Sequence, residues 1–105
     1  MPPVYSTQNA NTPSIIAGDG ASAITILSAN NARRGFSIQN VGTTAAKICF
    51  GTASTSVFHF VLKGGSVDND GTGGSITFNS GCIYNGIITM FGATTAKVVA
   101  LEQAP

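Results

Sequence analysis

The chain has 105 residues, of which only 9% are charged, with five Lys and Arg against four Asp and Glu. This length supports a single domain, and a net charge of +1 provides no basic surface for nucleic acid or anionic lipid, both of which need clustered Lys and Arg. No run of about 18 apolar residues exists to cross a membrane, and the N-terminus lacks the basic flank and apolar run of a secretory signal, so synthesis in the cytoplasm is expected.

Residues 1–21 are expected to form an extended N-terminal arm. Pro2, Pro3 and Pro13 stand among polar residues, and proline removes backbone donors and favours extended geometry in the residue before it. An arm of this kind gains little from folding back on a small domain, so we expect it to dock on a neighbouring chain. Its large apolar residues are the candidate contacts: Val4, Tyr5, Ile15 and Ile16.

Residues 22–105 are expected to form one all-β domain, an antiparallel β-sandwich or jelly-roll-like fold. Short runs rich in Ile, Val and Phe recur between clusters of Gly, Asn, Asp, Ser and Thr, at roughly the 8 to 12 residue spacing of sandwiches and barrels. The predicted strands are 23–28, 35–40, 46–50, 57–62, 75–78, 82–91 and 97–102.

Two of these strands, 57–62 and 82–91, carry apolar residues on both faces. A domain of this size buries only one face of a strand in its own core, so the other face is expected to meet another chain or the arm. The pattern therefore predicts self-association, and closed cyclic symmetry is favoured because open association would give fibres.

Residues 64–74 form one long, glycine-dense loop, which is typical of a rim. Within it, Asp68-Asn69-Asp70-Gly71 has the alternating oxygen ligands of a calcium loop, but no Glu follows within reach. A solvated turn is favoured and calcium stays open as an alternative. A phosphate cradle is disfavoured because a strand, rather than a helix, follows the glycines.

The inventory of reactive side chains favours a protein that is not an enzyme. His59 is the only histidine, so no multi-histidine metal site can form, and no serine occupies a Gly-x-Ser-x-Gly turn. We expect no cofactor, no metal and no small-molecule substrate. Cys49 and Cys82 would pair only if their strands were neighbours, which the sequence leaves open, and reduced thiols are favoured.

Arg33 and Arg34 form the only local basic pair. Two arginines are too few for nucleic acid but suit a bidentate contact to a carboxylate on a partner chain. A solvated pair at the start of a strand is the alternative.

Five segments carry a resemblance to a known group of proteins. They are RGFSIQNVG at 34–42, KICFG at 47–51, FHFVLKGG at 58–65, IYNGII at 83–88 and AKVVALE at 96–102. In this order, over residues 33–102, the chain resembles small virion proteins of tailed bacteriophages, in particular capsid decoration (cement) proteins and related head or fibre β-domains.

The resemblance implies a non-enzymatic domain on the capsid surface of the virion, oligomeric and often trimeric, that bridges neighbouring subunits of the major capsid protein. The alternative is a glycan- or receptor-binding module of a tail fibre or spike. That module would use an aromatic ring beside carboxylates and amides on one rim, and the candidate rim is Asp68, Asn69, Asp70 and Tyr84.

Overall fold

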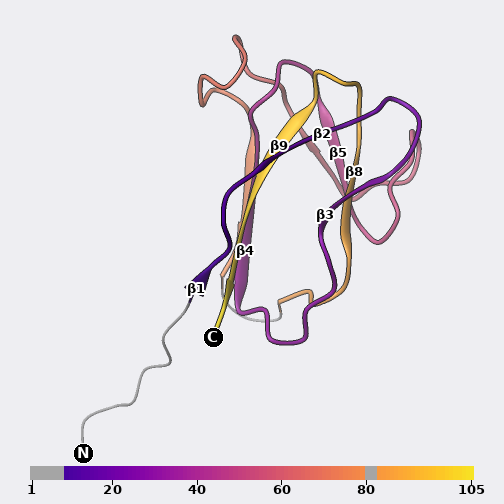
Figure 1. The fold of residues 1–105 in the computed structure, drawn as a ribbon. Helices are drawn as coiled ribbons and strands as arrows, with labels where there is room; N and C mark the ends of the chain where they lie inside the picture. The colour runs from indigo at the N-terminus through magenta and orange to yellow at the C-terminus, as the bar shows by residue number, and fades with distance from the viewer. Residues whose placement is uncertain (1–8, 80–82) are drawn as a thin grey trace, which may run out of the picture.

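The structure is a computed structural model that describes residues 9–79 and 83–105. Within these residues the fold is all-β, with nine strands in two antiparallel sheets. Sheet A contains β1 (Asn9–Ala10), β2 (Ile15–Ala17), β4 (Gly35–Asn40), β7 (Ser75–Phe78) and β9 (Lys97–Ala104). Sheet B contains β3 (Ile24–Leu27), β5 (Ala46–Phe50), β6 (Phe60–Leu62) and β8 (Ile88–Phe91). Figure 1 shows the two layers, with β4 and β9 in one and β3 and β8 in the other.

Sheet A is built around β4 and β9. The two strands pair with Ile38 opposite Ala100, and β7 pairs with the other side of β4, with Ile38 opposite Ile76. Both β1 and β2 pair with the far side of β9, and the spatial order is therefore β1 or β2, then β9, β4 and β7.

Sheet B has the order β3, β8, β5, β6. Ile48 of β5 lies opposite Met90 of β8 and Phe60 of β6. The register of β3 against β8 shifts between Thr25 and Leu27, which is a bulge-like irregularity at this edge of the sheet.

The core lies between the two sheets and follows the predicted alternation. Phe36 and Ile38 of β4 point inward and are almost fully buried, whereas Ser37 and Gln39 stay half-buried on the outer face. This is the period-two pattern of a sheet with one buried face. The other buried apolar side chains that fill the space come from both sheets: Ile48, Leu62, Ile88, Met90, Val98 and Ala100. The two-sheet sandwich is therefore confirmed, whereas the jelly-roll-like arrangement stays a prediction.

The expected arm differs from the structure in the part that is described. Residues 9–10 and 15–17 pair with β9 of the same chain instead of crossing to a neighbour. The reason is that Ile16, opposite Val98, packs against the core and gives this segment an apolar anchor in its own domain. Val4 and Tyr5 lie outside the described residues, and their docking on a neighbouring chain stays a prediction.

Two strands are shorter than the sequence predicts. The strand expected at 57–62 begins only at Phe60. The first residue of the strand expected at 82–91 lies outside the described residues, and from residue 83 onward this strand begins only at Ile88. Residues 51–59 instead form a loop across the outer face of sheet B. There the backbone N–H of Ala53 donates to Oγ1 of Thr89, and that hydroxyl donates to the carbonyl oxygen of Gly51, at 2.9 and 2.7 Å.

This covering loop corrects the expectation that β8 needs another chain on its outer face. Thr89 and Cys49, which lie opposite each other on β8 and β5, are both buried beneath residues of their own chain. The outer face of β6 is not covered in this way, because Val61 is 48% exposed, and a contact of β6 with another chain stays a prediction. No helix in the described part of the chain is long and apolar enough to span a membrane.

Candidate functional site

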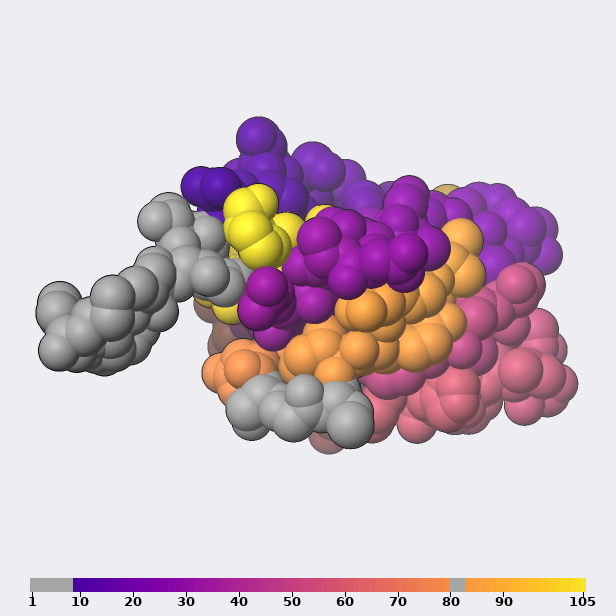
Figure 2. Space-filling model, turned by 90° about the horizontal axis from the view of Figure 1, so that it is seen from below, coloured from indigo at the N-terminus to yellow at the C-terminus, as the bar shows by residue number. Residues whose placement is uncertain are grey.

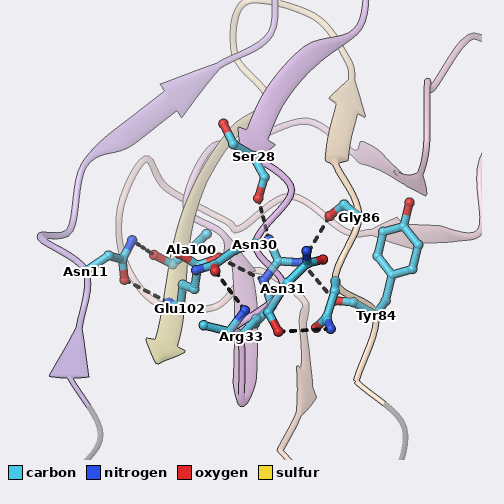
Figure 3. A network of polar contacts seen from close by, with 11 residues as sticks. Asn11, Ser28, Asn30, Asn31, Arg33, Tyr84, Gly86, Ala100 and Glu102 are labelled. Atoms are coloured by element: carbon cyan, nitrogen blue, oxygen red, sulfur yellow. Dashed lines mark hydrogen bonds and ion pairs between the residues drawn. The ribbon is translucent and has the colours of Figure 1, made fainter. Parts of the chain in front are cut away.

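The end of the sandwich where β4 begins, called here the Arg33 end, holds a network of polar contacts (Figure 3). The side chain of Arg33 is fully buried, and its Nε donates to Oε2 of Glu102 at 2.8 Å. Its Nη1 donates to the carbonyl oxygens of Tyr84 and Gly86, at 2.8 and 3.1 Å, and its Nη2 donates to that of Ser28 at 2.7 Å. One guanidinium therefore ties two chain segments, at Ser28 and at residues 84–86, to β9.

The same network extends to the strand pairing of β9. The side chain of Asn11 accepts from the backbone N–H of Glu102 at 2.8 Å and donates to the carbonyl oxygen of Ala100 at 3.0 Å. Its own backbone N–H donates to the carbonyl oxygen of Glu102 at 3.1 Å, so Asn11 holds the segment between β1 and β2 against β9. Seen from this end, residues 30–37 lie between the end of β9 and residues 83–90 (Figure 2).

The partner-chain role expected for Arg33 is wrong. The arginine does meet a carboxylate, as its chemistry predicts, but the carboxylate belongs to Glu102 of the same chain. A side chain with no exposed surface and four acceptors within the fold has no access to another protein. The neighbouring Arg34 is exposed, and its backbone N–H donates to Gln103, so a surface role for its side chain stays a prediction.

An aromatic cluster lies beside this network on the side where β6 and β7 form the sheet edges. Phe50 stands at its centre: its ring stacks on Tyr84 with centroids 4.7 Å apart and meets Phe78 edge-on at 5.7 Å. Phe36 stacks on Phe78 at 5.2 Å and Phe60 lies 5.9 Å from it. Contacts of this kind favour packing beyond the area that they bury, and Phe50, Phe60, Phe78 and Tyr84 are each only half-buried.

His59 lies at the margin of this cluster and is exposed. Its Nδ1 accepts from the backbone N–H of Phe50 at 3.1 Å, and its ring lies 5.6 Å from that of Phe50. In the covering loop nearby, Nζ of Lys47 donates to the carbonyl oxygen of Thr55 and lies over the ring of Phe58. These contacts fasten the loop to sheet B and give His59 a structural part.

The opposite end of the sandwich, called here the Asn40 end, is organised by one buried amide. Asn40 has no exposed surface, and its Nδ2 donates to the carbonyl oxygens of Thr44 and Leu62, at 2.8 and 2.9 Å. Its Oδ1 accepts from the backbone N–H of Gly42 at 2.9 Å. Gly73 packs so closely on the carbonyl oxygen of Asn40 that a Cβ there would overlap it, so glycine is required at that position.

The glycine-dense loop docks on this end through its own hydrogen bonds. The backbone N–H of Asn69, which has a φ of 57°, donates to the carbonyl oxygen of Val41 at 2.6 Å. Asp68 pairs with Lys97 at 3.2 Å. Asp70 accepts from the hydroxyl and the backbone N–H of Thr72, and these contacts hold the pKa of its carboxyl below the usual value.

The predicted ligand rim is therefore not assembled. Asp68, Asn69 and Asp70 lie at the Asn40 end, and Tyr84 lies at the Arg33 end, separated by the six residues of β4, or about 20 Å at roughly 3.3 Å per residue. The two aspartates of the possible calcium loop are engaged with different partners. No group of three or more His, Cys, Asp or Glu side chains among the described residues is placed to hold a metal ion.

Exposed apolar residues gather on the outer face of sheet A. Ile15 is 55% exposed and lies opposite Val99, and Leu101 points to the same side two residues along β9. Across β4 and β7 this face continues with uncharged side chains, and its one charged position, Lys97, is paired with Asp68. A second set on the outer side of sheet B comprises Val57, Phe58 and Val61. No pocket is found in the described part of the chain.

No protein-family model, curated protein or solved structure matches this chain.

The structural part of Asn40 could have been recognised from the sequence. Asn40 shares the inward phase of Phe36 and Ile38 on one strand, and a polar residue at an inward position needs hydrogen-bond partners when it is buried. The partners of Arg33 offered no such signal, because three of its four acceptors are backbone carbonyl oxygens.

Proposed function

We propose that this chain is a non-enzymatic structural protein of a phage virion, a capsid decoration protein that bridges neighbouring subunits of the head shell. The observation that supports this role most directly is the outer face of sheet A, where Ile15, Val99 and Leu101 form an apolar stripe beside uncharged polar side chains. A surface with few charges and several exposed apolar residues suits the centre of a protein interface. The resemblance adds a homotrimer and the major capsid protein as its partner.

The use of the charged side chains supports a structural role. Arg33 pairs with Glu102, Lys97 with Asp68, and Lys47 with the covering loop. Acid–base catalysis needs titratable groups that face a common space. Here the paired groups stand at separate places and stabilise loops and strand ends.

Binding to purified, expanded head shells tests the proposal. In Ile15→Lys a charge is placed on the outer face of sheet A, and we expect at least a tenfold loss of shell binding, because an unpaired charge at an interface core is costly. Val61→Lys is the matched control, since Val61 is similarly exposed but lies on the outer side of sheet B.

Wild type and Val61→Lys should add to the shells at the same defined copy number. Equal binding by Ile15→Lys would contradict the assignment of this face, and no binding by the wild-type chain would contradict the function.

The glycan-binding alternative loses its basis in the positions of its own residues. Stacking on Tyr84 together with hydrogen bonds to Asp68 or Asp70 would need one ligand to reach both ends of the sandwich. A glycan array with the purified chain is expected to give no hit, and a specific hit would revive that alternative.

A further inference from the structure

The two sheets have four free edges among the described residues, and three of them carry features that discourage pairing with another chain. β3 contains the register shift between Thr25 and Leu27. β6 has three residues and is followed by Lys63. The edge formed by β1 and β2 is interrupted by a segment that contains Pro13. Bulges, short strands, lysine and proline are the usual means by which proteins protect an open edge.

The fourth edge, β7, is also short, with four residues, but it contains no register shift, lysine or proline. It pairs with β4 in unbroken register over four residues, and residues 71–79 contain neither a charged residue nor a proline. Ser75 and Thr77 are exposed, and Ile76 and Phe78 point inward but are only half-buried. An edge that is flat, uncharged and rich in β-forming residues is a template for an added strand.

The hydrogen-bond phase shows which groups β7 presents to its free side. In an antiparallel pair, the residues that bond to one neighbour alternate with those that bond to the other side. Asn40 donates to Gly74 across the β4–β7 pair, whereas Val41 donates to Lys97 across the β4–β9 pair. Even-numbered residues of β7 therefore bond to β4, and the N–H and C=O groups of Ser75, Thr77 and Asn79 point away from it.

We propose that β7 pairs antiparallel with β7 of a second copy of this chain, about a two-fold axis through Thr77. In this register Thr77 lies opposite Thr77 of the partner, and Ser75 lies opposite Asn79 of the partner. All of these pairs use the outward-pointing backbone groups, and each exchanges two hydrogen bonds. The Thr77 pair occurs once and the Ser75–Asn79 pair occurs twice about the axis, so roughly six hydrogen bonds join the copies. The two copies of sheet A become one continuous sheet.

The side chains fit this register as well as the backbone does. Because residues directly opposite each other in a sheet share a face, Ile76 lies opposite Phe78 of the partner, and both point toward the core side. The second copy therefore covers the half-buried edge of the aromatic cluster at Phe78. The two Thr77 side chains meet on the outer face as a favourable cross-strand pair.

A contact through one short strand is small, so the dimer is expected to form at micromolar or higher concentration rather than below it. It is two-fold symmetric, unlike the trimer that the resemblance implies. Dimer formation is measured without head shells, so the absence of a dimer would leave the proposed capsid role to be tested separately.

Disulfide trapping tests the register, in a background in which Cys49 and Cys82 are replaced by Ala and Ser. Opposite residues of a hydrogen-bonded pair have Cα atoms about 5.5 Å apart, which suits a disulfide. Thr77→Cys should therefore give a covalent dimer on mild oxidation. Ser75→Cys is the matched control, because the two copies of residue 75 would be offset by four residues, or roughly 14 Å along the strands at about 3.4 Å per residue. A dimer from the double variant S75C/N79C should confirm the register.

Sedimentation of Thr77→Pro against Thr77→Val tests the backbone contact. Proline removes an N–H that points away from β4, so the fold keeps its internal ladder, and we expect the dimer dissociation constant to rise by about 30-fold. Thr77→Val keeps the N–H and should self-associate like the wild-type chain. Equal trapping at residues 75 and 77, a monomeric wild-type chain at about 100 µM, or a trimer unaffected by Thr77→Pro would each overturn the proposal.

Discussion

Truncation of Arg33 to alanine is expected to be among the most damaging single changes at a polar residue of this chain. The substitution removes four hydrogen bonds, leaves three backbone carbonyl oxygens without their donor, and separates Glu102 from its cation. Breaking a buried ion pair by removing one partner costs about 3–5 kcal/mol, and hydrogen bonds to a charged group contribute about 1.5–3 kcal/mol each but do not add in full. Because the side chain of Glu102 is 19% exposed, water restores part of the loss. We therefore expect about 4 kcal/mol.

Urea unfolding followed by far-UV circular dichroism measures this loss, since the chain has no Trp. At about 4–8 °C per kcal/mol for a domain near this size, the melting temperature should fall by roughly 15–30 °C. Arg34→Ala is the matched control and should change stability by less than about 0.5 kcal/mol, because Arg34 is exposed. A loss below about 1 kcal/mol in Arg33→Ala would refute the view that this network holds the end of the sandwich together.

Two further changes test the other polar contacts. Asn40→Ala should cost about 3 kcal/mol, because it removes the donor to the carbonyl oxygens of Thr44 and Leu62 and the nearer of the two acceptors of the Gly42 N–H, leaving only the carbonyl oxygen of Lys97 at 3.2 Å; hydrogen exchange at the Gly42 amide should accelerate. The Ser22 hydroxyl and the backbone N–H groups of Ala21 and Ser22 lower the pKa of Asp19 from 3.8 to about 2. The ionised Asp19 carboxylate therefore stabilises the fold at pH values above its unfolded-state pKa, and this stabilisation is lost as the pH falls through its folded-state pKa. The difference in urea midpoint between wild type and Asp19→Asn should therefore shrink between about pH 4 and pH 2, and a constant difference would contradict the assignment.

Clean alternation made much of the fold predictable. The strands at 35–40, 46–50 and 75–78 have the expected bounds. In each strand inward-facing and outward-facing residues alternate, and Gly, Asn or Thr lies near its ends. Tertiary contacts decided the rest. Residues 57–59 read as a strand but belong to the loop that covers Cys49 and Thr89.

The N-terminal segment and the candidate site show what local pattern cannot supply. Residues 9–17 are mostly polar and include Pro13, so the sequence alone does not favour strands there. Residues 9–10 and 15–17 nevertheless form strands, because β9 provides a pairing partner and Ile16 packs against the core. Residue chemistry alone suggests a shared rim of Asp68, Asn69, Asp70 and Tyr84. In the structure the length of β4 separates residues 68–70 from Tyr84, so they lie at opposite ends of the sandwich. Sequence identified the reactive side chains but not which of them would meet.

Cryo-electron microscopy of the virion to which we propose this chain belongs is the most direct test of the proposed capsid role. We expect a two-sheet β-domain at repeated positions on the head shell, between neighbouring capsid subunits, with Ile15, Val99 and Leu101 of sheet A turned toward them. Density for this domain only on a tail fibre, or a virion that lacks the protein, would contradict it.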